Sequence, residues 1–295
     1  MDPQYGHVLD LVKAALAEDI GPGDLTSLAC LEPDPVKAGV VAKCDGVLSG
    51  IVPFMMAFEI VDSANVVRPM IHDGDPFKSG DIVIEVDGFN QTVLASERVA
   101  LNFLGRLSGI ATLTRRFVDR LGSHPCTILD TRKTTPGWRW LEKAAVRHGG
   151  GGNHRMGLYD MILIKDNHIA SAGSITRAVD LTREYLHTPD FRLQFDCKAE
   201  HIQIEVEVTS ESELVEALNC GVTRLLLDNQ SIESLASLVK RARSINPEAK
   251  LEASGNVSLD TVAAIAATGV DYISVGALTH SAPVADFSMK VTPAV

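Results

Sequence analysis

The chain has 295 residues, of which 45% are hydrophobic and 22% charged, and its formal net charge is −11. This length accommodates one large domain, or a large and a small one, with a substantial core. The acidic balance argues against a nucleic-acid surface, which is usually broad and basic. No apolar run approaches the ~20 residues that span a bilayer, and the N-terminus lacks the basic start and apolar core of a signal peptide.

The cysteines point to a reducing compartment. They are odd in number, scattered, and form no C-x-x-C pair, which argues against a disulfide framework or a structural zinc site. We therefore expect reduced thiols in a cytoplasmic protein. The five are Cys30, Cys44, Cys126, Cys197 and Cys220.

The first 120 residues predict a small α+β domain. Apolar residues in His7–Asp19 recur on one helical face. Within Val36–Gly88, short β-rich runs alternate with turns, and a helix at Pro53–Val61 interrupts them. Thr92–Leu121 predicts a long helical region, continuous or broken near Ser108-Gly109.

After residue 121, short apolar runs alternate with helix-length amphipathic segments. This order predicts parallel strands joined by crossover helices. A barrel or near-barrel fits better than a dinucleotide-binding fold, because no glycine-rich turn opens the first βα unit. The predicted strands are Cys126–Asp130, Met161–Lys165, Ile202–Val208, Arg224–Leu227, Lys250–Ala253 and Tyr272–Val275.

Polar residues lie at or just after the end of every predicted strand. In a β/α barrel these positions share the face where active sites form. Six such ends are a much stronger signal than one or two. The residues are Thr131-Arg132-Lys133, Lys165 to His168, Glu205 with Glu207, Asp228-Asn229, Ser254-Gly255-Asn256 and Gly276-Ala277.

Cations are dense within Asp130–His168 although the chain is acidic, which predicts a pocket for a small, multiply charged anion. Arg132 offers a planar fork suited to a carboxylate, and Lys133 a point charge suited to phosphate. The alternative is a solvated loop before a helix capped by Thr135, which precedes a proline. The cations are Arg132, Lys133, His154, Arg155 and Lys165.

Other motifs are individually weaker. The Gly149–Gly152 run either brings backbone close to a ligand or links helix to strand. Glu205 and Glu207 share one face of a strand that is expected to be buried, and Asp228 is a similar case. Such carboxylates need cations, a metal or hydroxyls as partners, or they form a structural ion pair. Ser254-Gly255-Asn256 and Val275-Gly276-Ala277 suit a phosphate cradle. Trp138 and Trp140 are expected to pack, and His168 to be structural or second to the site because it lacks metal-ligand spacing.

These residues resemble the quinolinate phosphoribosyltransferase family, decarboxylating enzymes also called nicotinate-nucleotide pyrophosphorylases. The resemblance covers nearly the whole chain. A longer connection at Leu186–Ile204 departs from the family, as do Trp138 and Ala144, without touching a charged site residue. The matching blocks are Glu97–Asn102, Leu107–Thr112, Asp130–Gly137, Gly149–Arg155, Ile164–Ile169, Glu205–Val208, Leu227–Asn229, Ala253–Asn256 and Gly269–His280.

The resemblance implies an N-terminal α/β sandwich domain at 1–115, joined by a C-terminal tail at 284–295, and an open, incomplete TIM-like α/β barrel at 116–283. It also implies a homodimer or dimer-based oligomer, in which Arg98 reaches the neighbouring subunit's site. Quinolinate would be held by Arg132, His154, Arg155 and Lys165, and phosphoribosyl pyrophosphate with Mg²⁺ by Lys133, Glu207 and Asp228. The ribose phosphate would be bound at Ser254, Gly255, Asn256, Gly276 and His280, beside Thr131, Val275 and Ala277.

The implied activity is transfer of phosphoribosyl to quinolinate with loss of CO₂, a step of NAD biosynthesis. Lys133, Lys165, Glu207 and Asp228 are the expected catalytic residues, and Glu207 and Asp228 the metal ligands. One alternative is a phosphoribosyltransferase for a single-carboxylate base such as nicotinate, which the full cation set disfavours. Another is a non-catalytic barrel that binds a phosphorylated metabolite.

Overall fold

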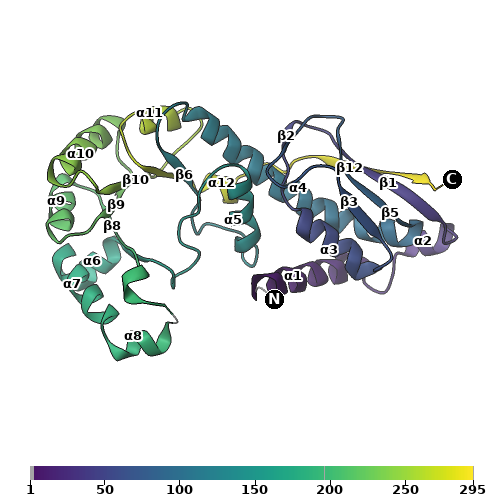
Figure 1. Cartoon of the computed structure of the whole chain (residues 1–295), viewed down its shortest axis with the longest axis horizontal. Coiled ribbons are helices and arrows are strands. Elements are labelled where there is room, and N and C mark those ends of the chain that lie inside the picture. Colours follow the sequence, from purple (N-terminus) through teal and green to yellow (C-terminus); the bar gives the residue numbers. More distant parts are fainter. Residues whose placement is uncertain (1–2, 196, 295) are drawn as a thin grey trace. The chain divides into compact units, whose positions relative to one another are not determined.

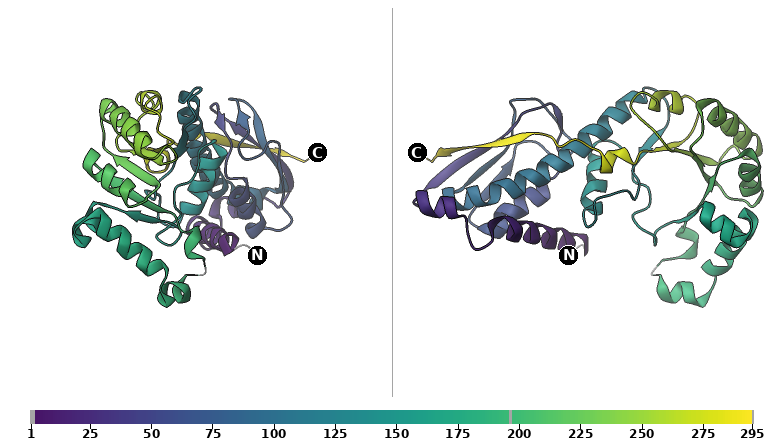
Figure 2. Two further views of the ribbon diagram at one scale, coloured as in Figure 1. Left: turned by 60° about the vertical axis from the view of Figure 1, so that its left-hand side comes forward. Right: turned by 180° about the vertical axis from the view of Figure 1, so that it is seen from behind.

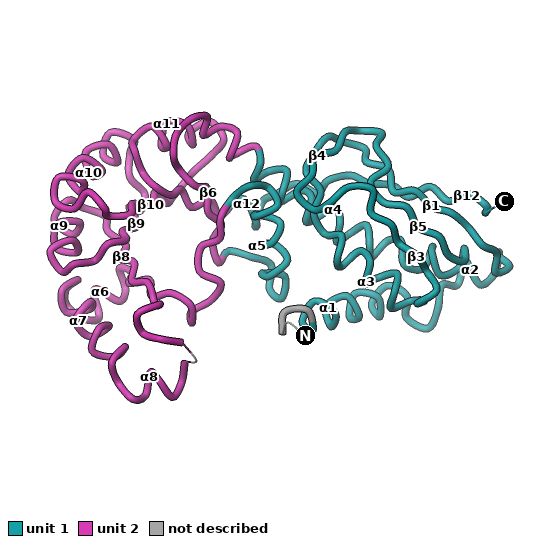
Figure 3. Tube along the Cα trace, viewed as in Figure 1, with its two compact units in different colours: residues 1–115, 133–151, 277–295 teal, residues 116–132, 152–276 magenta. Residues whose placement is uncertain are grey.

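The computed structural model describes residues 3–195 and 197–294. The chain forms two compact units (Figure 3). Unit 1 comprises residues 1–115, 133–151 and 277–295, and unit 2 comprises residues 116–132 and 152–276. The chain therefore passes between the units four times, and the basic motif at residues 131–133 lies on one of these passages.

Unit 1 is built on a four-stranded antiparallel sheet in the order β12-β1-β5-β3. Alternate residues of β1 are buried, which gives this strand one core face. The C-terminal strand pairs along the whole of β1, from Val36↔Pro293 to Ala42↔Phe287. The strands are β1 (Pro35–Ala42), β3 (Val66–Pro69), β5 (Ile82–Phe89) and β12 (Phe287–Pro293), and β2 (Gly46–Val47) pairs separately with β4 (Pro76–Phe77).

The helices of unit 1 include most of α4, the longest helix in the described part of the chain, which is continuous and continues past residue 115 into unit 2. Ser108-Gly109 does not break it. A Cβ on Gly109 would collide with the carbonyl oxygen of Pro283, and one on Gly105 would lie 2.8 Å from the carbonyl oxygen of Ala285. The small residues therefore admit a crossing segment. The helices are α1 (Pro3–Ile20), α2 (Leu25–Cys30), α3 (Ile51–Val61), α4 (Asn90–Arg120), α5 (Arg139–His148) and α12 (Ala277–His280).

Unit 2 is an open barrel, as predicted. Its six parallel strands lie in the order β6-β11-β10-β9-β8-β7, and no pairing among the described strands joins β7 to β6. Each predicted strand is present, with ends shifted by one or two residues. They are β6 (Thr127–Leu129), β7 (Ile162–Ile164), β8 (Ile204–Val208), β9 (Arg224–Asp228), β10 (Lys250–Ser254) and β11 (Tyr272–Ser274).

Helices lie outside the curved sheet of unit 2 (Figures 1 and 2). Three crossover helices begin at a serine, Ser174, Ser210 or Ser231, whose side chain accepts the amide hydrogen three residues later. The helices are α6 (Asp166–Ala172), α7 (Ile175–Leu186), α8 (Pro189–Gln194), α9 (Glu211–Asn219), α10 (Ile232–Ile245) and α11 (Val262–Ala266).

The connection at residues 186–204 forms helix α8 and a 3₁₀ turn at Ala199–His201. Phe191 is buried and stacks on Phe195 with ring centroids 5.3 Å apart. The third strand of the barrel consequently begins at Ile204, two residues after its predicted start. None of the described helices combines the length and the apolar character that crossing a membrane requires.

Candidate active site

Three neighbouring strands of the barrel end in polar side chains. β8 carries Glu207, and the last residues of β9 and β10, Asp228 and Ser254, are partners in the parallel register. Lys165 follows β7, and its Nζ lies 3.3 Å from Glu207 Oε2. The predicted convergence of these four residues at the carboxyl ends of the strands is therefore present within unit 2.

The turns after β9 and β10 are tied together. Asn229 and Asn256 both have left-handed backbone, with φ of 51° and 49°, and the Asn229 amide donates to the Ser254 carbonyl at 2.9 Å. A Cβ at Gly255 would collide with the Asn229 side chain, so only glycine fits there. Strained backbone of this kind is typical of ligand sites. Asn229 follows a predicted site residue, Asp228, but was not itself predicted to belong to the site.

A buried carboxylate at the end of β6 places the second cationic segment. Asp130 is fully buried, and it accepts the His154 amide at 2.9 Å and the Asn153 side-chain amide at 2.6 Å. Burial and the neighbouring Arg132 guanidinium lower the pKa of Arg155. Arg132 therefore acts on Arg155 from a separate segment, and the carboxylates of Asp160 and Glu205 partly offset its charge.

The glycine run serves packing. Gly149 lies so close to Ala111 and Thr114 of α4 that no Cβ would fit, and a Cβ on Gly152 would lie 2.9 Å from the Leu129 side chain. Gly152 also donates to the Ile128 carbonyl at 2.7 Å. The run therefore brings the chain against α4 within unit 1 and against β6 within unit 2.

Lys133 follows the basic strand end but belongs to unit 1. Its carbonyl accepts the Thr279 hydroxyl at 2.8 Å. Glu142, fully buried, accepts the amide and hydroxyl of Thr135 at 3.1 and 2.9 Å, and pairs with Arg106 Nη2 at 2.9 Å. Arg106 and Glu142 thus support the loop that carries Lys133. No local pattern in the sequence indicates this role for either residue.

The helix after this loop begins later than a cap at Thr135 requires. Helix α5 starts at Arg139 with Trp138 as its N-cap, so the predicted cap is wrong. Trp138 stacks on Phe103 with ring centroids 4.5 Å apart, which confirms it as a packing residue. His168 is structural, as predicted, because its Nδ1 accepts the Lys165 amide at the start of α6.

The remaining predicted site residues divide between the units. Arg98 is exposed on α4, and His280 is exposed at the end of α12, both in unit 1. Thr131 and Arg132 follow β6 in unit 2, where Val275 and Gly276 follow β11. Ala277 opens α12.

The barrel interior holds a charged network, and only His154 and Glu205 of its members were predicted from the sequence. Arg224 Nε donates to Glu205 Oε1 at 3.0 Å, and its Nη2 donates to Glu252 Oε2 at 2.7 Å. His154 Nε2 lies 3.0 Å from Glu205 Oε2, and Ser274 donates to Glu252. Both carboxylates are fully buried.

The pKa values of the two buried carboxyl groups, Glu205 and Glu252, are shifted in opposite directions. Burial raises the pKa of Glu205, but the hydrogen bond from His154 and the charge of Arg224 outweigh it, so its pKa is lowered overall. Burial and the charge of Glu205 raise the pKa of Glu252 to about 7. One guanidinium thus balances one carboxylate, and the second carboxyl is mainly protonated only below about pH 7.

Two groups of residues offer metal-ligand chemistry. His154, Glu205 and Glu252 have ligand atoms within 4.8 Å of one another, but Arg224 already supplies the cation between the carboxylates. Glu207 and Asp228 fit Mg²⁺ better, because each has a partly accessible carboxylate with one oxygen that meets no protein partner in the described residues.

An open parallel barrel with paired arginines, carboxylates and strained turns at its strand ends has the features of an enzyme for small anionic substrates. The chain belongs to the quinolinate phosphoribosyl transferase family. The C-terminal domain of that family matches residues 110–290, and its N-terminal domain matches residues 24–108.

Relatives of known name agree with this assignment. The chain is 42% identical to a probable nicotinate-nucleotide pyrophosphorylase [carboxylating] of Bacillus subtilis, over 93% of this chain and 90% of that protein. It is 43% identical to the chloroplastic nicotinate-nucleotide pyrophosphorylase of Arabidopsis thaliana, over 95% and 82%. A crystal structure of NadC from Streptococcus pyogenes superposes with a TM-score of 0.88 at 39% identity, covering 97% and 96% of the two chains.

Proposed function

We propose that this enzyme transfers the phosphoribosyl group of phosphoribosyl pyrophosphate to quinolinate and removes one carboxylate, giving nicotinate mononucleotide, pyrophosphate and CO₂. The observation that carries the proposal is that Arg132 follows β6 while Asp130, at the same strand end, anchors the segment of Arg155 through the His154 amide, and the charge of Arg132 lowers the pKa of Arg155. Membership of the family, whose curated relatives carry the names of this activity, supports the reaction.

Quinolinate has two adjacent carboxylates that must be neutralised together. One arginine cannot pair with both, whereas Arg132 and Arg155 offer two planar forks and Lys165 adds a point charge. Each charge-assisted hydrogen bond contributes roughly 1.5–3 kcal/mol. His154 precedes Arg155, and only 7% of its side chain is exposed.

Phosphoribosyl pyrophosphate takes the neighbouring part of the site. Lys133 binds its phosphates, and the ring nitrogen of quinolinate attacks the anomeric carbon as pyrophosphate leaves. Positive charge then develops on the sugar, where the carboxylates of Glu207 and Asp228 stabilise it. Within unit 2, the 5′-phosphate is cradled by the small-residue turns and their neighbours: Thr131, Ser254, Gly255, Asn256, Val275 and Gly276.

Magnesium would be held by Glu207 and Asp228 together with the substrate phosphates. Mg²⁺ keeps oxygen ligands and uses few from the protein, which suits two partly accessible carboxylates. When bound, the ion offsets the charge of the pyrophosphate. The chain's own contribution is to hold two anions together that would otherwise repel, and to exclude water from them.

Decarboxylation follows from the same geometry. Once the ring nitrogen carries the ribose, the ring is cationic and stabilises the electron pair that stays on the adjacent ring carbon when its carboxylate leaves as CO₂. A proton from water then takes the place of the carboxylate on that carbon. Lys165 and the paired arginines then need only to keep the carboxylate in place beside the nitrogen.

We also propose a homodimer, or a larger assembly of dimers, in which Arg98 enters the partner's site. Arg98 is exposed on α4, and no ion-pair partner for it lies among the described residues. Mixing Arg98→Ala chains with Lys165→Ala chains should restore part of the activity that each variant lacks alone. Absence of recovery despite proven subunit exchange would contradict a shared site.

The protein is proposed to work in the cytoplasm. All five cysteines are free thiols in the structure, which suits a reducing compartment.

The proposed function is tested by removing the guanidinium of Arg132. Arg132→Ala should lose quinolinate binding far more than phosphoribosyl pyrophosphate binding, measured by calorimetry with each substrate. Equal loss of both would contradict the assignment of the arginines to the dicarboxylate.

A further inference from the structure

The imidazole of His154 uses both ring nitrogens inside the chain. Nδ1 accepts the backbone N–H of Arg155 at 2.7 Å, and Nε2 lies 3.0 Å from Glu205 Oε2. An accepting Nδ1 has no proton, so the proton is on Nε2 and is donated to Glu205. In this arrangement neither ring nitrogen is left to donate to a bound carboxylate.

The position of Glu205 depends in turn on Arg224. The guanidinium forks between Glu205 and Glu252, and Ser274 donates to the other oxygen of Glu252. Bonds of this kind are strong and directional, and these two carboxylates are fully buried. The ring of His154 is consequently fixed by side chains from β8, β9, β10 and β11.

We propose that Glu205, Arg224 and Glu252 form a positioning network that controls quinolinate binding through His154, by fixing the backbone at Arg155 and therefore the Arg155 guanidinium. His154 is then a positioning residue rather than a ligand of quinolinate. This inference rests on the function proposed above and deepens it.

The physical need for such a network is repulsion between arginines. Burial and the charge of Arg132 lower the pKa of Arg155. The segment carrying Arg155 has two anchors, Asp130 on the His154 amide and the network on the His154 ring. Without the contact between the network and the His154 ring, the guanidiniums of Arg132 and Arg155 can move apart. Quinolinate must then order them when it binds, and this lowers its affinity.

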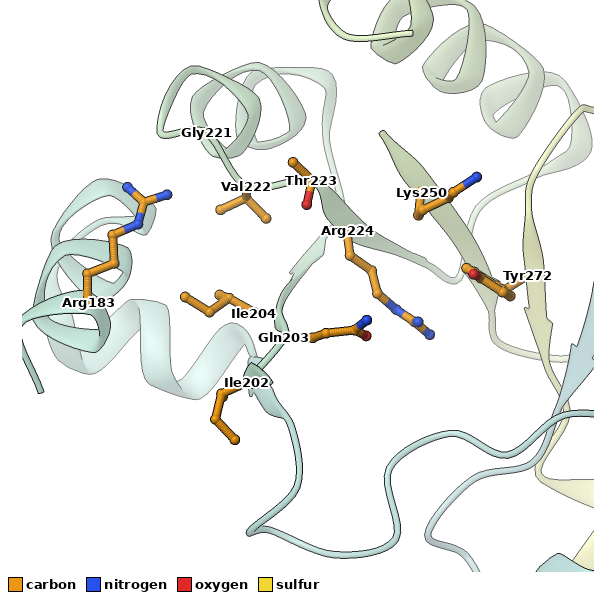
Figure 4. Close-up of a pocket in the computed structure, with 10 residues that line it drawn as sticks. All are labelled: Arg183, Ile202, Gln203, Ile204, Gly221, Val222, Thr223, Arg224, Lys250 and Tyr272. Atoms are coloured by element: carbon orange, nitrogen blue, oxygen red, sulfur yellow. The ribbon is translucent and has the colours of Figure 1, made fainter. Parts of the chain in front are cut away.

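Arg224 can be reached from outside the site. A cavity of about 280 Å³ lies at the amino ends of β8 to β11, opposite the ends that carry Glu207 and Asp228, and Arg224 forms part of its wall. Figure 4 shows Arg224 extending from β9 toward Tyr272, and its guanidinium carbon lies 4.5 Å from the Tyr272 ring centroid. Truncating Arg224 would enlarge this cavity toward the two carboxylates.

The cavity beside Arg224 allows the Arg224→Ala variant to be tested by chemical rescue with guanidinium. Arg224→Ala should raise the KM for quinolinate about tenfold, with kcat and the KM for phosphoribosyl pyrophosphate within about twofold of wild type. Guanidinium chloride at low millimolar concentration should enter through the cavity and lower the raised KM. The same salt should leave wild-type kinetics unchanged.

A matched control is available at the same end of the barrel. Arg243 bonds Asp271 at 2.7 Å and the Ala249 carbonyl, but it has no link to His154. Arg243→Ala should therefore destabilise the fold without changing the KM for quinolinate. If Arg224→Ala does not fold, Arg224→Lys replaces it, because lysine keeps the charge but cannot fork, and an intermediate rise in this KM alone is expected.

The outcomes separate the two proposals. Wild-type protein without quinolinate turnover would overturn the proposed function and this inference with it. Wild-type turnover with the same KM for quinolinate in the Arg224 and Arg243 variants, or a raised KM that guanidinium does not lower, would overturn the network alone.

Discussion

Glu205 and Glu207 lie two residues apart on β8 and share one face of the strand, yet their surroundings differ. Glu205 is fully buried and meets His154 and Arg224. The Glu207 side chain is 12% exposed, and its charged partner is Lys165, which is 45% exposed. Two residues along the same strand face, the environment changes from the buried, paired carboxylate of Glu205 to that of Glu207, which solvent and substrates can reach.

Depth along the barrel therefore decides what a carboxylate can do. A buried carboxylate that is already satisfied stabilises the fold and holds its neighbours in place. A carboxylate at the strand end keeps an oxygen for a metal ion or a sugar. The comparison predicts that losses at the strand end appear mainly in turnover, and losses in the interior mainly in stability and substrate affinity.

The largest expected effect is on turnover at the strand ends. Glu207→Gln and Asp228→Asn should each lower kcat about 10²–10³-fold, because each removes a charge that stabilises the developing sugar cation. Steady-state kinetics with both substrates saturating would measure this. Glu211→Gln, which removes an exposed carboxylate paired with Arg241, is the control and should retain wild-type kcat.

The next effect is on stability in the barrel interior. Glu205→Ala should lower the free energy of unfolding by about 3 kcal/mol, because it leaves the Arg224 guanidinium and the His154 ring short of a partner. Glu207→Ala should change it by less than about 1 kcal/mol. Urea denaturation of both variants compares them directly, and equal losses would contradict the distinction by depth.

A smaller effect concerns the pH dependence of stability. Glu252 faces Glu205, Arg224 and His154, and its pKa is raised to about 7 from 4.5. The folded state therefore holds a proton between these values that the unfolded state has released, so this contribution falls as pH rises from 4.5 to 7.

The corresponding test compares wild type with Glu252→Gln. The difference in their free energies of unfolding should change with pH by at most about 1.4 kcal/mol per unit below pH 7 and level off above it. A difference that stays constant from pH 5 to pH 8 would show that Glu252 is ionised throughout.

The smallest expected effect on stability is at the exposed ion pair. Lys165→Met should change the free energy of unfolding by less than about 1 kcal/mol, because its pairing with Glu207 is open to solvent. The same variant should lose most of its activity. A large loss of stability would show that Lys165 supports the fold rather than the reaction.

The sequence was enough to predict the barrel strands and the residues at their ends, because both follow from local patterns. Apolar runs located all six strands, and polar residues directly after them located Lys165, Asp228 and Ser254. The open barrel is confirmed by the strand order and by the superposition on related structures.

What could not be predicted depends on contacts between distant segments. Arg224 is the first residue of β9 and Glu252 the middle residue of β10, and only the lateral order of β8, β9 and β10 brings them to Glu205. The link between Arg106 and Glu142 spans 36 residues and has no local signal. From the sequence alone, Ser108-Gly109 can indicate a break in the helix. The structure shows instead that the small residues of α4 make room for the segment at Pro283 and Ala285.

The central claim is tested most directly by one product analysis. Purified protein is incubated with phosphoribosyl pyrophosphate, Mg²⁺ and either quinolinate or nicotinate, and CO₂ and nicotinate mononucleotide are measured. The account predicts equal amounts of both products with quinolinate and negligible nucleotide with nicotinate. Nucleotide formed as readily from nicotinate, or quinolinate bound without any CO₂ released, would contradict it.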